Sequence, residues 1–245
     1  MKNKNIYIMP MSGIGKRFKI EGFKKPKPLI NVKSTPMFIK AAESHGLNNK
    51  WFFIVRKNRF ANNYKKLINK KFKNKKIIFL KNKTDGQART VSKAKKYINP
   101  FSNIIITSCD LYIEYNKKIL EKKLHKNDFV VFINKPNKFN IDNFNNFGWI
   151  KLKNEKILKS SCKSKVSNKP EKDWIIIGIF AFKNIEIFKK LLNNLFKSRL
   201  MVNNEFYLDT CVEIALKLKM KVSYIKVKKY ISWGTPKELN NFNTL

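Results

Sequence analysis

The chain has 245 residues, and 43% of them are apolar, which is enough for one large α/β domain or two small ones. Its 54 basic residues against 16 acidic ones give a formal net charge of +38. No apolar run reaches the ~18 residues that a membrane helix requires, so the sequence predicts no membrane span.

The high charge has two readings. The functional interpretation is that the charge binds a nucleic acid or an anionic membrane. However, the lysines are spread along the whole chain, and they accompany many asparagine, isoleucine and phenylalanine residues, a mixture typical of AT-rich coding sequence. We therefore favour compositional drift and no specific nucleic-acid partner, with non-specific polyanion binding at low salt.

The cysteines are few and widely separated, at positions 109, 162 and 211. They show no zinc or redox spacing, so we expect free thiols and a cytoplasmic location. The histidines, His45 and His125, also lack partners at motif spacing, and we interpret both as surface or packing residues. The sequence leaves a homo-oligomer open.

Strand and helix patterns alternate along the first half. We expect strands over 6–9, 28–32, 51–55, 77–80, 103–107 and 129–133, and helices over 35–46, 59–72, 84–98 and 116–125. This alternation predicts an α/β fold with a mainly parallel sheet covered on both faces.

The second half differs in character. We expect a mobile loop over 135–147, a hairpin over 148–159, an irregular segment over 160–173, strands over 174–182 and 222–227, and helices over 185–196, 205–218 and 236–242. Without a repeat or a linker, one continuous domain is expected, with the second half adding a lid or pocket wall.

The segment after the first strand is the strongest functional signal. Gly13 and Gly15 allow backbone conformations in which successive N–H groups face one anion, and Lys16 and Arg17 add positive charge. The spacing fits neither a Walker A loop nor a dinucleotide fingerprint, so an ordinary turn is the alternative.

Two further residues are candidates for phosphate chemistry. Lys27 lies between two prolines, which should hold it in an extended backbone and aim its side chain. Asp110 follows the apolar strand at 103–107, where a carboxylate is well placed to hold Mg²⁺. The alternative for Lys27 is that it is one more lysine in a lysine-rich chain, and the alternative for Asp110 is that it caps the next helix.

Gly86 and Gln87 stand at a predicted helix start. The glutamine amide suits the edge of a nucleotide base, because it offers both a donor and an acceptor. Capping of the helix by Thr84 or Asp85 is an equally good interpretation of the same residues.

Taken in order, these pieces resemble the sugar nucleotidyltransferases, also called nucleotide-sugar pyrophosphorylases, along nearly the whole chain. The matching segments are Met11-Ser12-Gly13-Ile14-Gly15-Lys16-Arg17, Pro26-Lys27-Pro28-Leu29, Thr84-Asp85-Gly86-Gln87, Ser108-Cys109-Asp110, Phe147-Gly148-Trp149, Lys163, Asn204-Glu205-Phe206-Tyr207 and Trp233-Gly234-Thr235-Pro236.

The resemblance implies a Rossmann-like, glycosyltransferase-A type three-layer sandwich. It also implies a reaction of an NTP with a sugar 1-phosphate, with Mg²⁺, to give an NDP-sugar and pyrophosphate, as in surface polysaccharide synthesis. The implied catalytic residues are Arg17, Lys27 and the metal ligand Asp110. The implied nucleotide-binding residues are Met11, Ser12, Gly13, Gly15, Lys16, Gly86 and Gln87, and the acceptor-binding residues are Gly148, Lys163 and Glu205.

Two positions depart from the family pattern. Cys162 stands where many members have the glutamate of a Glu-Lys pair, which removes an acceptor for a sugar hydroxyl. Ser232 stands where many members have a second metal-binding aspartate, and serine is a far weaker Mg²⁺ ligand. Metal binding then rests on Asp110, the phosphates and water, or on another acidic residue.

Three alternatives stay open, two of them because of these departures. One is a cytidylyltransferase acting on phosphocholine or another small phosphate or phosphonate. A second is a non-catalytic nucleotide-binding homologue. The third, which rests on the charge alone, is nucleic-acid binding.

Overall fold

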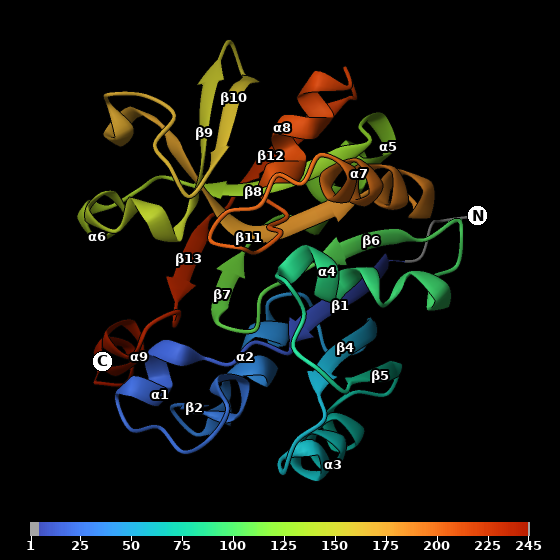
Figure 1. Cartoon of the computed structure of the whole chain (residues 1–245), viewed down its shortest axis with the longest axis vertical. Coiled ribbons are helices and arrows are strands. Elements are labelled where there is room, and N and C mark those ends of the chain that lie inside the picture. The colour runs from blue at the N-terminus through green and yellow to red at the C-terminus, as the bar shows by residue number, and fades with distance from the viewer. Residues whose placement is uncertain (1–4, 245) are drawn as a thin grey trace.

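A nine-stranded sheet runs through the computed structural model, which describes residues 5–244 (Figure 1). The strands are β1 (Asn5–Met11), β2 (Asn31–Val32), β3 (Thr35–Pro36), β4 (Lys50–Arg56), β5 (Lys75–Leu80), β6 (Asn103–Ile106), β7 (Leu111–Glu114), β8 (Phe129–Asn134), β9 (Gly148–Lys153), β10 (Lys156–Cys162), β11 (Trp174–Phe182), β12 (Val222–Lys226) and β13 (Lys229–Ser232). The helices are α1 (Lys16–Ile20), α2 (Met37–Glu43), α3 (Ala61–Lys71), α4 (Gln87–Ser92), α5 (Lys117–Lys126), α6 (Lys138–Asp142), α7 (Ile185–Lys197), α8 (Thr210–Lys217) and α9 (Pro236–Asn243).

The sheet is mixed and largely parallel. Strands β5, β4, β1 and β6 pair in parallel, and β12 pairs in parallel with β8. Strand β11 joins the two parts of the sheet, because it pairs antiparallel with β6, β8 and β9. This arrangement confirms the predicted α/β fold with a mainly parallel sheet.

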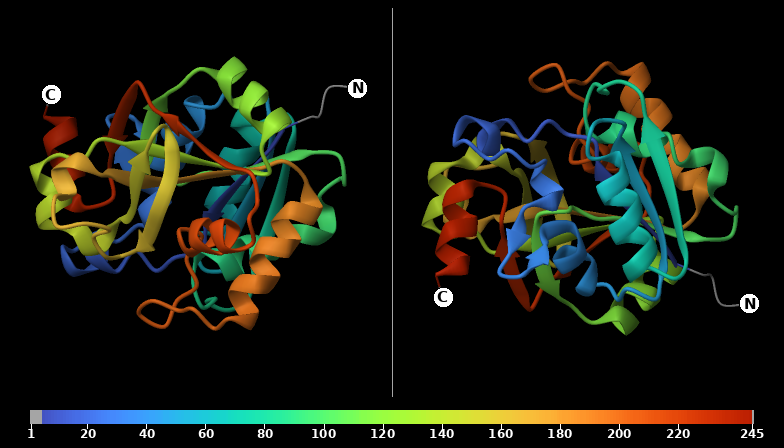
Figure 2. Two further views of the ribbon diagram at one scale, coloured as in Figure 1. Left: turned by 90° about the horizontal axis from the view of Figure 1, so that it is seen from above. Right: turned by 90° about the horizontal axis from the view of Figure 1, so that it is seen from below.

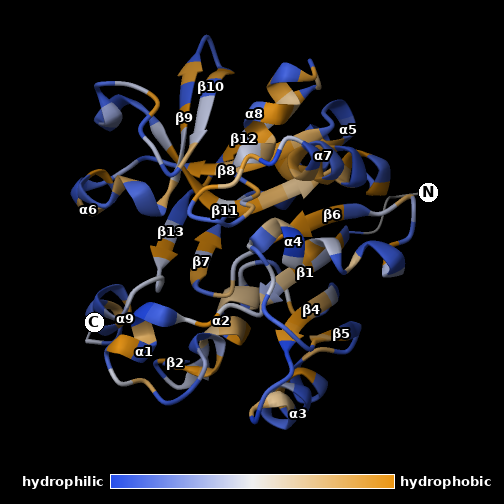
Figure 3. Cartoon of the chain, in the orientation of Figure 1, coloured by the Kyte–Doolittle hydropathy of each residue, from blue (hydrophilic) through white to orange (hydrophobic). Residues whose placement is uncertain are grey.

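Alternating side chains of the strands supply two hydrophobic cores. From β1, Tyr7 and Met9 enter one core, while Ile6 and Ile8 enter the other. Helices α2, α3 and α5 cover the first core, and α4, α7 and α8 cover the second. Figure 2 shows α5 and α7 on opposite sides of the sheet, and Figure 3 shows the apolar residues concentrated along the strands.

The centre of β11 is irregular. Its register against β8 shifts between Ile176 and Phe180, and Gly178 in this stretch has a φ of 74°. Glycine adopts this left-handed conformation without the strain that a side chain would bring. Bulges of this kind re-aim strands beside functional sites, and here the irregular stretch faces a cavity.

Several boundaries correct the expectations from sequence. The helix expected over 35–46 begins at Met37, because Thr35 and Pro36 form the short strand β3. The helix expected over 84–98 is α4 followed by a 3-10 turn at Lys95–Tyr97. Neither Thr84 nor Asp85 caps α4, since its N-cap residue is Gly86.

The prediction of a mobile loop over 135–147 is wrong, because the segment is largely helical. It contains α6 and a 3-10 turn, Phe144–Asn146. Helix α6 begins with a reciprocal capping box between Asn137 and Asn140. The abundance of asparagine predicted a loop, whereas here asparagine side chains supply the hydrogen bonds that start a helix.

Two pairing strands, β7 and β13, were not expected from sequence. They form a separate antiparallel ribbon in which Leu111 lies opposite Ser232. The helix expected from 205 begins only at Thr210, and residues 205–209, the wall segment, are irregular and end in a turn. No helix within residues 5–244 is long and apolar enough to cross a membrane.

Candidate active site

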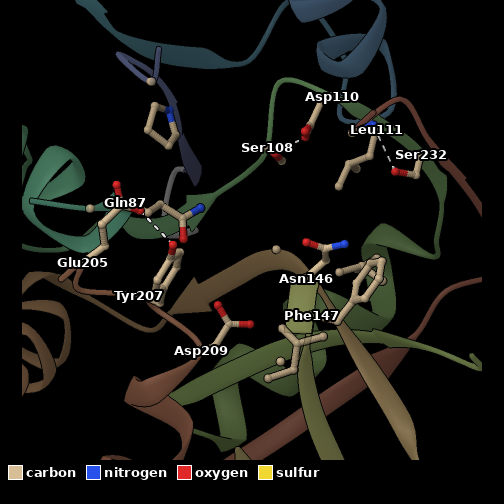
Figure 4. Close-up of a pocket in the computed structure, with 18 of the residues that line it drawn as sticks. Gln87, Ser108, Asp110, Leu111, Asn146, Phe147, Glu205, Tyr207, Asp209 and Ser232 are labelled. Carbon is tan, nitrogen blue, oxygen red and sulfur yellow. Dashed lines mark hydrogen bonds between the residues drawn. The ribbon is translucent and has the colours of Figure 1, made fainter. Parts of the chain in front are cut away.

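A cavity of about 390 Å³ opens where β1 and β6 end and β11 bends (Figure 4). Ligands of open α/β sheets bind at the carboxyl ends of the strands, so this is the expected place for a site. The predicted residues that line the cavity are Ser12, Gly13, Arg17, Lys27, Gly86, Gln87, Asp110, Gly148, Lys163 and Glu205.

Three predicted nucleotide-binding residues do not line it. Met11 is 4% exposed and belongs to the hydrophobic core, since it is still part of β1. Lys16 is exposed at the start of α1. Gly15 is the N-cap residue of α1, with a φ of 67°, and a Cβ there would lie 3.2 Å from the Cβ of Lys27.

Lys27 and Asp110 form an ion pair at one end of the cavity. Lys27 also donates a hydrogen bond to the carbonyl of Gly234 (2.9 Å). Lys27 begins a 3-10 turn, Lys27–Leu29, instead of the extended backbone expected between two prolines. Burial alone would raise the pKa of Asp110, but the Lys27 ammonium and the Ser108 hydroxyl outweigh it and lower that pKa.

Arg17 connects two walls of the cavity. Its guanidinium donates a hydrogen bond to the side-chain carbonyl of Asn146, 129 positions later in the chain. Lys163 donates to the backbone carbonyl of the same Asn146 (2.6 Å). One asparagine therefore accepts hydrogen bonds from the predicted triphosphate side and from the predicted acceptor side.

The predicted base-binding segment is held by backbone contacts. The amide of Phe206 donates to the carbonyl of Asp85 (2.9 Å), and the amide of Ala88 donates to the carbonyl of Phe206 (3.0 Å). Gly86 lies between them with a φ of 107°, and a Cβ there would be 2.5 Å from the Phe206 backbone. Glycine is therefore required at position 86 for packing as well as for any contact with a base.

The opposite wall carries the predicted acceptor residues. The Lys163 ammonium lies over the ring of Tyr207, 4.9 Å from its centroid. The Tyr207 hydroxyl donates to Glu205 (2.7 Å), and Lys83 lies 3.4 Å from the same carboxylate. Glu205 is thus already partnered from two directions.

Sequence reasoning missed Asn146 and Asp209 as lining residues, and it named Tyr207 only as part of a segment that resembles the family. Asn146 lay in the segment interpreted as a mobile loop. Tyr207 and Asp209 lay in the segment interpreted as a helix. A helix start placed at Thr210, with Asp209 as its N-cap residue, would have exposed the wall segment before it.

The residues near Asp110 fit a magnesium ion that arrives with phosphates. Within residues 5–244, no cluster of three or more His, Cys, Asp or Glu side chains forms a complete metal site. Mg²⁺ commonly uses one or two carboxylates, with phosphates and water as its other ligands. Glu238 is a second carboxylate at this end of the cavity, but Thr235 donates two hydrogen bonds to it (2.9 Å each).

Comparison with known families identifies the family of this chain. Residues 10–243 match the family model described as nucleotidyl transferase. The chain belongs to the nucleotidyl transferase family. This confirms the family and the enzyme class predicted from the motifs, and a comparison with functionally curated proteins finds no match.

Solved nucleotidyl transferase structures share the fold. A nucleoside-diphosphate-sugar pyrophosphorylase from Vibrio cholerae RC9 has a TM-score of 0.82 at 18% identity, covering 98% of this chain and 100% of its own. A UTP-bound UGPase from Acinetobacter baumannii has a TM-score of 0.73 at 13% identity, covering 98% and 92%. An inositol-1-phosphate CTP transferase from T. maritima has a TM-score of 0.71 at 12% identity, covering 100% and 96%.

Proposed function

We propose that the protein transfers a nucleoside monophosphate from an NTP to a sugar 1-phosphate, giving an NDP-sugar and pyrophosphate for surface polysaccharide synthesis. One observation carries the proposal. Asn146 receives hydrogen bonds from Arg17 and Lys163, so the cationic groups proposed for the two substrates meet across one cavity. One structural neighbour is a nucleoside-diphosphate-sugar pyrophosphorylase, which supports the same class of substrate.

The chemistry requires positioning and charge neutralisation more than a covalent nucleophile. A phosphate oxygen of the acceptor attacks the α-phosphorus of the NTP, and pyrophosphate leaves. In our assignment Arg17 steadies the β- and γ-phosphates, and Lys27 turns from Asp110 to the α-phosphate. Lys163 holds the acceptor phosphate, with Glu205 and Gly148 on the acceptor side.

Asp110 would hold Mg²⁺, which neutralises phosphate charge when bound. The backbone from Ser12 to Gly13 would approach the phosphates, and Gly86 and Gln87 would contact the base. We also assign residues 1–134 to the nucleotide and 135–245 to the acceptor. We propose a cytoplasmic enzyme, because the three cysteines are free.

A second candidate acceptor is phosphocholine or a related small phosphate. The aromatic rings of Phe139, Phe147 and Tyr207 line the cavity together with the carboxylate of Asp209. Aromatic faces and carboxylates together suit a quaternary ammonium group. A cytidylyltransferase with such an acceptor would use the same phosphate-binding residues.

A pyrophosphate-release screen tests the proposal. The four common NTPs would be combined with glucose 1-phosphate, N-acetylglucosamine 1-phosphate and phosphocholine, with and without Mg²⁺. We expect Mg²⁺-dependent release with at least one pair. Nucleotide binding without turnover of any pair would instead indicate a non-catalytic homologue.

Lys27→Gln is the sharpest variant for this screen. We expect kcat to fall roughly 10²- to 10³-fold, because a charge aimed at the transition state is lost. The matched control is Lys25→Gln, since Lys25 is an exposed lysine two positions away. Equal activity of both variants would remove Lys27 from the proposed mechanism.

A further inference from the structure

The side chain of Asp209 is a buried carboxylate that projects into the cavity. Asp209 is 8% exposed and lines the cavity wall. Figure 4 shows it on the opposite side from Asp110, with Tyr207 and Phe147 nearby. A carboxylate this deeply placed needs hydrogen-bond donors or a cation to offset the loss of water.

Capping of the helix that follows does not account for this carboxylate. Asp209 is the N-cap residue of α8, but its side chain makes no capping hydrogen bond. Aspartate at this position normally accepts hydrogen bonds from the first turn. Among the residues that the structure describes, no side chain donates a hydrogen bond to it.

The surroundings keep Asp209 only partly compensated. Burial raises the pKa of Asp209, while the Lys163 ammonium and the amides of Asp209 and Gly148 act in the opposite direction. Glu205, by contrast, is held by Lys83 and Tyr207. Of these two acceptor-side carboxylates, Asp209 is therefore the one left without a side-chain donor among the described residues.

Gly148 makes room for Asp209. A Cβ at position 148 would lie 2.9 Å from the carboxyl carbon of Asp209 and closer still to one of its oxygens. Any larger residue would push the carboxylate out of place. The glycine predicted to contact the acceptor therefore also fixes where this carboxylate stands.

The neighbouring Cys162 cannot supply a negative charge instead. Burial, followed by the charge of Asp209, raises the pKa of the Cys162 thiol to about 12, so it is neutral at physiological pH. Asp209 is therefore the acid beside Gly148 that can carry a negative charge.

We propose that Asp209 is a specificity-determining residue, which accepts a hydrogen bond from a hydroxyl or binds an ammonium group of the phosphorylated acceptor. This inference rests on the proposed function and deepens it. Lys163 would bind the phosphate end of the acceptor, and Asp209 would select its electropositive end. An acceptor without such a group would leave the carboxylate buried and unpaired, and would be rejected.

Two variants test the assignment by different routes. Asp209→Asn removes the charge at nearly constant volume, and Gly148→Ala displaces the carboxylate without altering it. For each, KM and kcat would be measured for the acceptor and for the NTP found in the screen. We expect acceptor KM to rise about 10- to 100-fold in both, with NTP KM within about twofold of wild type.

The matched control is Asp173→Asn. Asp173 is also a buried aspartate (3% exposed), but it lies outside the cavity and accepts a hydrogen bond from Ser167 (2.5 Å). We expect it to leave acceptor KM unchanged. Thermal unfolding of all three variants would show which ones fold, and if Asp209→Asn does not, Gly148→Ala still tests the idea.

The choice of acceptor distinguishes the two chemistries. If glucose 1-phosphate is the substrate, we would test its 2-deoxy, 3-deoxy, 4-deoxy and 6-deoxy analogues. One of them should bind wild type more weakly than glucose 1-phosphate does, whereas Asp209→Asn should bind the two equally well. If phosphocholine is the substrate, Asp209→Asn should lose about 100-fold in affinity for it, measured as a higher acceptor KM. Wild-type turnover with unchanged acceptor KM in both variants would overturn the inference, whereas no wild-type turnover would overturn the proposed function.

Discussion

Asp110 and Asp209 are two carboxylates of one cavity with opposite electrostatic surroundings. The ammonium of Lys27 holds the pKa of Asp110 below its usual value, whereas burial holds that of Asp209 above it. A group with a raised pKa adds stability at low pH, and this is lost as pH rises through the folded-state pKa. In its charged form, Asp209 therefore works against folding.

Asp209→Asn should consequently stabilise the substrate-free protein at pH 7. We expect a gain of about 0.5–2 kcal/mol in the free energy of unfolding, measured with urea. The gain should shrink as pH falls, because protonation of wild-type Asp209 removes the same charge. A variant less stable than wild type at pH 7 would show that the carboxylate has a structural partner.

At the residue scale, most of the site residues predicted from motifs line the cavity. Lys27 and Asp110 could be predicted because prolines and an apolar strand flank them in the sequence. Asp209 could not, because its role depends on Gly148, 61 positions earlier, and on a side chain that turns away from the helix it precedes. Such a contact leaves no local pattern.

At the scale of elements, a buried polar network lies behind the site. His45, just after α2, makes hydrogen bonds with Thr107 (2.9 Å) at the end of β6 and with Tyr115 (3.0 Å) just after β7. Thr107 is three positions before Asp110. His45 thus ties together the elements that flank the predicted metal ligand.

This network should make stability depend on pH. Burial lowers the pKa of His45 from 6.5 to about 3, so the folded protein keeps the ring neutral while the unfolded chain protonates it. Stability is then present above pH 6.5 and falls by up to about 1.4 kcal/mol per pH unit towards pH 3.

His45→Gln should flatten that dependence, measured by urea unfolding between pH 7 and pH 4. His125→Gln is the control, because His125 is exposed on α5. If the two variants show the same slope as wild type, His45 does not carry the effect.

Gly86→Ala should damage the pairing between the start of α4 and the wall segment. The new methyl group would meet the Phe206 backbone at 2.5 Å, in a backbone conformation unfavourable for alanine. We expect a loss of about 2–4 kcal/mol in stability and a higher NTP KM. Thermal unfolding and steady-state kinetics measure the two effects, and an unchanged melting temperature would contradict the geometry.

Element types were more predictable than element boundaries. The apolar strands β4 and β11 are clear in sequence because long buried runs have few alternatives. Strands β7 and β13 are short and pair with each other across more than 100 positions, so neither has a strong local pattern. The asparagine-rich α6 was missed because asparagine serves both loops and helix starts.

At the scale of the whole molecule, the net charge of +38 should act on substrate capture. Both proposed substrates are anions, and a positive field raises their local concentration at low salt. We expect NTP KM to rise severalfold between 20 and 300 mM NaCl, with kcat nearly constant. A salt-independent KM would show that the distributed lysines do not act on the site.

The backbone of Phe206 has a consequence for the order of events. It makes hydrogen bonds on both sides of Gly86, in the proposed base segment, and the next residues along the chain are Tyr207, Leu208 and Asp209. A bound base would immobilise this shared segment. The acceptor would then bind to a wall that is already ordered, at a lower cost in entropy. We therefore expect compulsory-order kinetics with the nucleotide first, in which the acceptor protects the protein from hydrogen exchange only when a nucleotide is present. Equal protection by the acceptor alone would show that the two halves of the cavity fill independently.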